Sequence, residues 1–294
     1  MTTNAVNPNA DIFRPAGTAA KDAWQVLITP EDAGWEWSGL KVLTLEPGQE
    51  QTFDTGEFEA LVLPLAGACD VRLGEASHQL QGRPGVFKGV TDFVYVPRHQ
   101  QVVISSRAGG RFAVPTARAT SDLPAAYYPA SQVRTDLRGA GDCSRQVNNY
   151  ALNTGVETSH LLVCEVLTPG GNWSSYPAHK HEEHSDVERE LEEIYYFEIA
   201  DGPAGPGFGF HRTYGTPGRP IDLIAEVHTG DVALVPHGWH GPCVAAPGYD
   251  MYYLNVMAGP AEDGVWMSVD DPQHHWLRTT WQDQDVDPRL PFKN

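Results

Sequence analysis

The chain has 294 residues, of which 41% are hydrophobic, so it can bury one large core or two of ordinary size. Its formal net charge of −18 argues against nucleic acid or an anionic membrane as a partner, because both would repel it. No apolar run approaches the ~20 residues of a membrane span, and the first residues do not resemble a secretory signal. The scattered cysteines lack a CxxC pair, so we expect reduced thiols and a cytoplasmic protein.

Short runs of β-branched and aromatic residues, separated by Gly, Pro and Asp, predict an all-β fold. In the first half these runs are FEALVLPLAG, DVRLG, DFVYVP, QVVISS and RFAVPTARA. Residues 120–146 are rich in Pro, Gly and polar side chains, which indicates a crossing between domains. Beyond this segment the strand-like runs are SHLLVCEVLTPGG, EEIYYFEI, GFGFHRTY, DVALVP and MYYLNVMAG. The only strongly charged stretch with a helix-like composition is 182–192.

The two halves of the chain carry similar patterns in the same order. DFVYVP in the first half matches DVALVP in the second, and EALVL from Glu59 resembles EIYYF from Glu193. This repetition predicts a duplicated all-β domain of ~130 residues, each copy a closed sandwich or barrel. We therefore expect one domain over residues 1–140 and a second over residues 141–294.

Four side chains of the second half form a candidate metal site. His179 and His181 are one residue apart, so on a strand they share a face. Glu193 opens the next apolar strand and is taken as the inward carboxylate, with Glu192 as the alternative if the register slips by one. His240 follows a Pro-Gly turn. Three imidazoles and one carboxylate suit Zn, Mn, Fe(II) or Ni and leave positions for water or substrate.

The charged residues around this site have simpler interpretations. HEEH at 181–184 has one residue too few for the HExxH motif of zinc proteases. We expect His184 and its acidic neighbours, including Glu182 and Glu188, to form a solvated loop or helical turn. Lys180 lies between the two histidines, so alternation directs it away from the metal and toward the surface.

The motifs of the second half resemble the cupin superfamily. The resemblance consists of HxH, the strand-opening Glu, and Gly230, Pro236 and Gly238 followed by His240. This chain has a single residue between Gly238 and His240, where cupins usually have two, and a long insertion before Glu193. These departures, with YPAHKH, LEEIYYF, GDVALVPHGWH, YDMYYLNVMAGP and DPRLPF, resemble the 5-deoxy-glucuronate isomerases of inositol catabolism. GVFKGVTDFVYVP in the first half is also similar to that family.

The resemblance implies a bicupin, two jelly-roll barrels in one chain, related to the 4-deoxy-threo-5-hexosulose-uronate ketol-isomerases. It implies conversion of 5-deoxy-D-glucuronate, an aldehyde, to 2-deoxy-5-keto-D-gluconate, a ketone. It also implies a divalent ion on His179, His181, Glu193 and His240, with Zn expected and Mn or Fe(II) as alternatives. The first half has no HxH and carries Gln101 in the place of a histidine. Its barrel is therefore expected to hold no metal.

Such an isomerisation needs a Lewis acid for the carbonyl and a base for the neighbouring carbon. Arg212 is the predicted partner of the substrate carboxylate, because a guanidinium binds a carboxylate through two hydrogen bonds. Tyr253 and Asn255 share a strand face and are expected in the pocket. Glu193, Arg212 and Tyr253 are thus the candidate catalytic residues. The base stays open between Glu193, a metal-bound hydroxide and a tyrosinate.

Two other functions fit the same residues. An Fe(II)-dependent cupin dioxygenase would use three histidines and one glutamate, and would need oxygen. A non-catalytic sugar-binding cupin would have no need of an intact metal site. In each case the expected partner is a small molecule, here a deoxyuronate, and a homo-oligomer remains an open alternative.

Overall fold

The computed structural model describes residues 11–292 and confirms the all-β prediction. The first strands are β1 (Phe13–Arg14), β2 (Trp24–Ile28), β3 (Ser38–Leu45), β4 (Glu50–Asp54), β5 (Phe58–Leu73), β6 (Ala76–Arg83), β7 (Phe93–Val96), β8 (Gln101–Ser105), β9 (Gly110–Arg118) and β10 (Ala126–Tyr128). The later strands are β11 (Arg134–Arg138), β12 (Arg145–Asn149), β13 (Leu162–Thr168), β14 (Trp173–Ser174), β15 (His179–Lys180), β16 (Glu192–Ile199), β17 (Gly209–Thr216), β18 (Arg219–Val227), β19 (Val232–Val235), β20 (Cys243–Ala245), β21 (Met251–Ala258) and β22 (Val269–Asp270).

Between residues 11 and 292, helical structure is confined to short segments. These are α1 (Pro30–Ala33), α2 (Leu277–Thr280), η1 (Ala130–Gln132), η2 (Gly141–Cys143) and η3 (Trp281–Asp283). Within the described residues, no helix is long and apolar enough to cross a membrane. The charged stretch 182–192 is not helical before β16, contrary to its composition.

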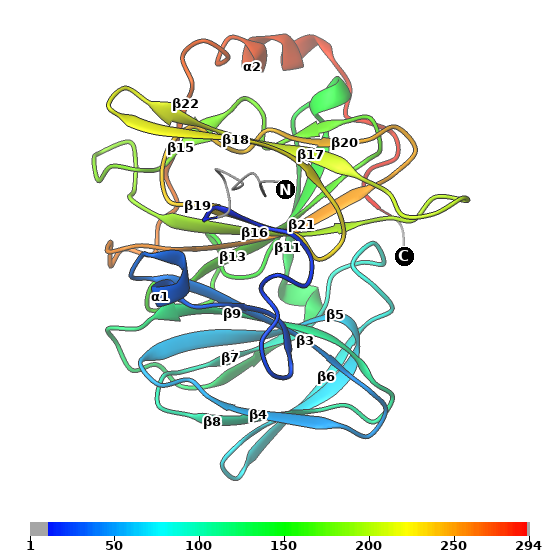
Figure 1. The fold of residues 1–294 in the computed structure, drawn as a ribbon, viewed down its shortest axis with the longest axis vertical. Coiled ribbons are helices and arrows are strands. Elements are labelled where there is room, and N and C mark those ends of the chain that lie inside the picture. Colours follow the sequence, from blue (N-terminus) through cyan, green and yellow to red (C-terminus); the bar gives the residue numbers. More distant parts are fainter. Residues whose placement is uncertain (1–10, 293–294) are drawn as a thin grey trace, which may run out of the picture.

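The strands divide between two stacked halves of the molecule (Figure 1). Strands β2 to β10 form a nine-stranded sheet, and a seven-stranded sheet has the order β1-β19-β16-β21-β13-β12-β11. A four-stranded sheet, β14-β20-β17-β18, and the pair β15-β22 complete the second half. Sheet membership therefore changes between β10 and β11, inside the segment that was expected to be a crossing. That segment is more regular than expected, because it contains both strands.

Side chains on the two faces of strand β16 pack into two different hydrophobic cores. Tyr195 and Phe197 pack inside the second half, whereas Ile194 and Tyr196 belong to a cluster that also contains side chains of the first half. This alternation puts Glu193 on the same face as Tyr195, as the sequence predicted. Glu192 points to the other face and meets the first half of the chain.

Two glutamates near the starts of their strands, Glu59 and Glu192, each bind backbone of the opposite half. Glu192 accepts backbone N–H bonds from residues 36–38 at 2.7, 2.9 and 2.8 Å. Glu59 accepts backbone N–H bonds from residues 159–161 at 2.6, 2.6 and 2.7 Å. Each carboxylate therefore satisfies three donors of a loop in the opposite half, which would otherwise be costly to bury.

Strand pairing corrects the predicted match between Glu59 in the first half and Glu193 in the second. Val235 pairs with Glu193 in the second half, and Val96 pairs with Ala60 in the first. Since each valine directly precedes the proline of its motif, Ala60 is the counterpart of Glu193. Glu59 corresponds instead to Glu192, one residue away from the predicted match. The sequence similarity was real, but its register was shifted by one.

The acidic segment between His181 and Glu193 is partly buried by its own contacts rather than fully solvated. Glu182 and Glu188 are 8% and 3% exposed, contrary to the expectation of a solvated loop, whereas His184 is exposed as predicted. Glu188 binds the ammonium group of Lys180 with both oxygens at 2.9 Å and accepts the Glu182 N–H at 2.7 Å. Glu182 accepts the Gly238 N–H at 3.0 Å. These partners make burial tolerable, and they also cover Lys180, which was expected at the surface.

A buried ion pair links the two halves near their interface. The Arg83 guanidinium donates to both oxygens of Glu165 at 2.8 and 2.7 Å, and the two side chains are 1% and 0% exposed. Asn148 and the Tyr150 hydroxyl donate to the same carboxylate at 2.7 and 3.1 Å. Every oxygen of this carboxylate therefore has a donor.

Glu165→Gln is expected to lower the free energy of unfolding by about 3–5 kcal/mol, because it leaves Arg83 as an uncompensated buried charge. The control is Glu50→Gln, which breaks an ion pair with Arg72 whose side chains are 57% and 51% exposed. That change should cost no more than about 1 kcal/mol. Urea unfolding of both variants measures the difference, and equal losses would contradict the role of burial.

Candidate metal centre

Four predicted side chains converge in the second half of the molecule. One ligand atom from each of His179, His181, Glu193 and His240 lies within 4.8 Å of the others. In the part of the chain that the structure describes, this is the one such group of histidine, cysteine or acidic residues. His181, Glu193 and His240 are 2%, 3% and 0% exposed, and His179 lines a cavity. The cluster could hold a metal ion.

Strand pairing brings these residues together from separate elements. His179 lies in β15, His181 follows that strand, and Glu193 lies in β16. His240 lies beyond β19, and its backbone exchanges two hydrogen bonds with His179, at 3.0 and 2.9 Å. Gly238 has a φ of 90° and would place a Cβ 2.6 Å from a carbonyl oxygen. Only glycine fits that turn without strain, and the turn sets the direction of His240.

The geometry of the imidazoles fits a bound cation. The Nε2 atoms of His181 and His240 are 3.0 Å apart, and each is 2.9 Å from Oε2 of Glu193. Their Nδ1 atoms face the carbonyl oxygens of Leu191 and Gly238 at 3.1 and 2.8 Å. A carbonyl only accepts, so each Nδ1 carries a proton and each ring turns its Nε2 atom toward the centre. A metal ion between these two nitrogens and the carboxylate oxygen would bind all three at once, while the carbonyl partners hold the rings in place.

The electrostatics of the remaining ligands agree with this. Burial and the neighbouring His240 lower the pKa of His179 well below its ordinary value, so its ring is neutral. Burial alone would raise the pKa of Glu193, but the adjacent His181 and His240 lower it below its ordinary value. The cluster thus offers three imidazole nitrogens and one carboxylate. Such a set suits a divalent transition metal ion.

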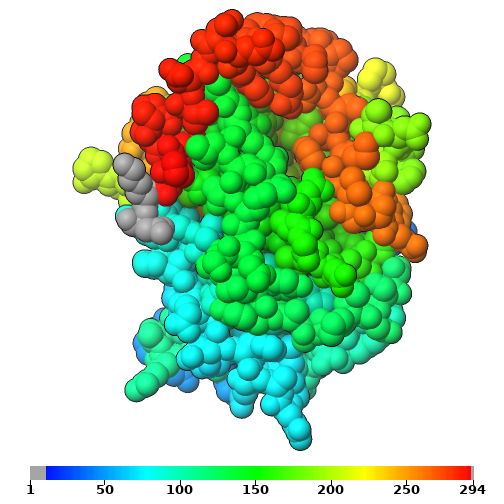
Figure 2. Space-filling view, turned by 180° about the vertical axis from the view of Figure 1, so that it is seen from behind, coloured from blue at the N-terminus to red at the C-terminus, as the bar shows by residue number. Residues whose placement is uncertain are grey.

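A cavity of about 340 Å³ adjoins the cluster, and His179 and Glu193 form part of its wall. This volume falls in the ~300–1,000 Å³ range of small-molecule sites. The space-filling view shows a hollow between the green, orange and orange-red segments, which are the parts of the chain that line the cavity (Figure 2). The remaining lining residues that carry polar groups are Arg138, Arg145, Cys164, Ser175, Tyr195, Trp266, Asn255, Ser268, Arg278 and Trp281.

Arg212 lies outside this cavity, contrary to the sequence-based expectation. Its guanidinium binds Asp222 and the backbone oxygens of Thr213 and Leu223. It lines a separate surface pocket, on the outward face of β17. The alternation of the strand explains this, because the neighbours His211 and Thr213 are buried and direct Arg212 to the opposite face.

Tyr253 and Asn255 differ in their relation to the cavity. The Tyr253 hydroxyl is buried and bonds to Ser174 and Ser175 at 2.9 and 2.8 Å, and of these residues Ser175 lines the cavity. Burial raises the pKa of Tyr253 well above its ordinary value, which argues against a tyrosinate base. Asn255 does line the cavity, and its buried Nδ2 has no partner among the described residues. That amide is free to donate to a bound ligand.

Sequence reasoning missed three arginines of the cavity wall. Arg138 and Arg145 come from the segment interpreted as a crossing, and Arg278 comes from α2. A usable signal existed, since a chain with only 20 basic residues places Arg134, Arg138 and Arg145 close together. Composition alone did not show that β11 and β12 form part of the second barrel.

Comparison with known sequences gives a consistent family. The KduI/IolB family profile matches residues 12–277. The 5-deoxy-glucuronate isomerase of Geobacillus kaustophilus is 40% identical over 268 residues, covering 90% of this chain and 94% of that protein. The protein of the same name from Bacillus subtilis strain 168 is 34% identical, covering 85% and 91%.

Solved structures agree with the sequence relatives. An IolB-like protein from Salmonella typhimurium LT2 superposes with a TM-score of 0.83 at 31% identity, covering 90% of this chain and 98% of that one. A Bacillus subtilis oxalate decarboxylase, a bicupin, superposes with a TM-score of 0.60 at 10% identity, which supports the fold alone. The predicted bicupin fold is confirmed, and the chain belongs to the KduI/IolB family.

Proposed function

We propose that this protein is a 5-deoxy-glucuronate isomerase of inositol catabolism in the cytoplasm. It would convert the aldehyde 5-deoxy-D-glucuronate to the ketone 2-deoxy-5-keto-D-gluconate. The observation that carries the proposal is the convergence of three histidines and Glu193 beside a cavity of about 340 Å³, in a chain 40% identical to a relative of that name. The reaction moves one hydrogen from C2 to C1 and one proton from the C2 hydroxyl to the C1 oxygen, so it needs no net oxidation.

The proposed ligands of the metal are His179, His181, Glu193 and His240, with Zn as the expected ion and Mn or Fe(II) as alternatives. A divalent ion bound there supplies Lewis acidity toward the substrate carbonyl. The four side chains hold the ion at the cavity wall.

Glu193 is the proposed residue that transfers the proton between C2 and C1. Other titratable groups of the wall fit this role poorly. Burial raises the pKa of Cys164 to about 12 and that of Tyr195 well above its ordinary value, so both stay protonated near neutral pH. Tyr253 positions Ser175 from behind the wall. Asn255 offers its unpaired amide to a substrate hydroxyl.

The first half is proposed to be a structural barrel without metal. We propose two units that follow the expected division at residue 140, except that β11 belongs to the sheet of the second unit and β1 pairs with β19 of the second unit. Ala60 stands where the second half has Glu193, and Gln101 is exposed. The first half therefore lacks the carboxylate, and it binds the second half through Glu59.

Metal analysis of the purified protein, together with an anaerobic assay on 5-deoxy-D-glucuronate, tests the function. Chelation is expected to abolish turnover, and Zn²⁺ without oxygen is expected to restore it, since Lewis acidity alone is required. A requirement for iron and O₂ would favour a cupin dioxygenase. A metal-free protein that binds sugars without turnover would favour a sugar-binding cupin. Full turnover by the metal-free protein would mean that the ion is structural.

A further inference from the structure

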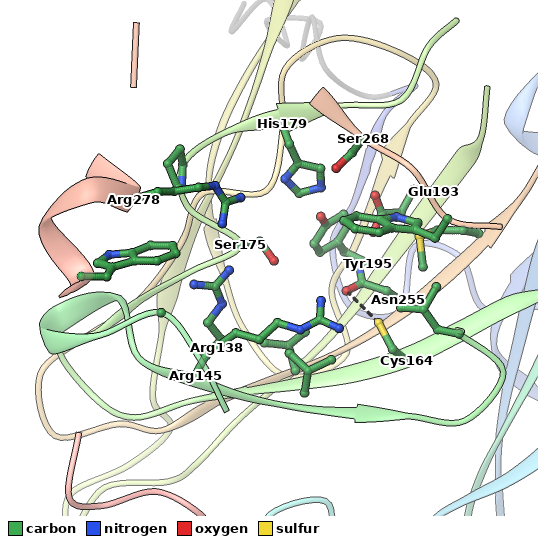
Figure 3. Close-up of a pocket in the computed structure, with 18 residues that line it drawn as sticks. Arg138, Arg145, Cys164, Ser175, His179, Glu193, Tyr195, Asn255, Ser268 and Arg278 are labelled. Carbon is green, nitrogen blue, oxygen red and sulfur yellow. Dashed lines mark hydrogen bonds between the residues drawn. The ribbon is translucent and has the colours of Figure 1, made fainter. Parts of the chain in front are cut away.

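Three arginines face the metal-binding side chains across the cavity. Arg138, Arg145 and Arg278 line it together with His179 and Glu193. Figure 3 shows the three guanidinium groups directed toward the centre from one side, while His179 and Glu193 lie on the other. The cavity therefore has a cationic wall and a metal-binding wall, separated by the space that a ligand would occupy.

Arg145 is the unusual member of the three. It is 7% exposed, and within residues 11–292 it has no carboxylate partner. Its guanidinium donates to the Cys143 carbonyl oxygen at 3.1 Å and lies 5.7 Å from the centre of the Trp281 ring. Burial above all, and then the positive charges of Arg278 and Arg138, lower the pKa of Arg145 to about 10. A buried cation without a counter-ion is costly, and an arriving anion would remove that cost.

The other two arginines are already held by acidic partners. Arg278 donates to both oxygens of Asp270 at 2.5 and 2.8 Å. Arg138 donates to Asp136 at 3.2 Å. These ion pairs fix the two guanidinium groups and leave further N–H groups unused. The wall thus has an excess of positive charge, centred on Arg145, in a protein whose net charge is −18.

We propose that Arg145, flanked by Arg138 and Arg278, binds the carboxylate of the substrate and so places its opposite, carbonyl end beside His179 and Glu193. This proposal rests on the proposed function and names the part of the site that selects a uronate over a neutral aldose. A planar guanidinium with a free edge suits a carboxylate, which it can bind through two parallel hydrogen bonds. Substrate and product both keep this carboxylate, so the same contact serves both directions of the reaction.

The test compares charged and neutral ligands on the metal-loaded protein. In Arg145→Met, the KM for 5-deoxy-D-glucuronate is expected to rise roughly 30-fold or more, the usual effect of removing one partner of a buried charged pair. Turnover of the neutral 5-deoxy-D-glucose should change little. Arg145→Lys should restore the KM only in part, because an ammonium group cannot form two parallel bonds. Arg134→Met removes the same charge outside the cavity and serves as the control.

A binding measurement separates the subsite from the reaction. Calorimetry compares D-glucuronate with D-glucose on the wild-type protein and on Arg145→Met. A wild type that does not isomerise the deoxyuronate, but prefers D-glucuronate until Arg145 is replaced, would leave the subsite standing and reject the function. Isomerisation with the KM and the D-glucuronate preference unchanged in Arg145→Met would overturn the subsite alone. A lower Tm and equal loss of both sugars would also overturn it, since a purely structural arginine predicts that result.

Discussion

His240→Ala is expected to lose both the bound metal and turnover, with kcat/KM falling roughly 100-fold or more. Loss of a residue that merely supports a metal ligand costs about 10–100-fold, so loss of a ligand should cost at least as much. Nε2 of His240 lies 2.9 Å from Glu193 and 3.0 Å from His181, in the middle of the cluster. Without it, only His179, His181 and Glu193 remain, and the ion is held more weakly and in a changed geometry.

The fold should survive this substitution. The hydrogen bonds between His240 and His179 use backbone atoms, which alanine keeps. The matched control is His184→Ala, which removes an exposed histidine three residues from His181. Metal content and kcat/KM are measured on both variants, with Tm in excess Zn²⁺. A His240→Ala protein that keeps one metal ion and wild-type turnover would show that the site lies elsewhere.

Local periodicity explains why much of the metal centre could be predicted. In HxH and in the strand that begins near Glu193, side chains two residues apart share a face, as in any β-strand. This repeat can be recognised in the sequence itself. The glycine of the Pro-Gly turn before His240 indicates a special backbone conformation, and Gly238 has it. The sequence thus predicted which four side chains converge.

The substrate side of the cavity depends on contacts between distant segments. Arg145 is buried because β12 pairs with β11 and β13 and because its guanidinium lies against the Trp281 ring of η3, and neither contact leaves a local pattern. Arg212 looked suitable by residue type, but its strand turns it outward. Glu182 and Glu188 were expected to be solvated because they are charged. Backbone donors and Lys180 instead supply the partners that allow them to be buried. Long-range partners decided each of these cases.

The two adjacent glutamates at the start of β16 allow the sharpest separation of chemistry from folding. Glu193 faces the cluster, and Glu192 accepts three backbone N–H bonds from the first half. Glu193→Gln is expected to lose metal and to lower kcat/KM roughly 100-fold or more, because the neutral amide is a poor ligand for a divalent ion. Glu192→Gln should keep both metal and turnover.

The cost of Glu192→Gln should appear in stability instead. A glutamine can turn only one acceptor oxygen toward the three N–H donors of residues 36–38, and its NH₂ group would face the others. Loss of hydrogen bonds to a charged group lowers the free energy of unfolding by about 1.5–3 kcal/mol. Urea unfolding and metal analysis are carried out on both variants. If Glu193 is the ligand, Glu193→Gln loses the metal and Glu192→Gln loses stability. The opposite pattern, with metal lost only from Glu192→Gln, would mean that β16 is shifted by one residue and that Glu192 is the ligand.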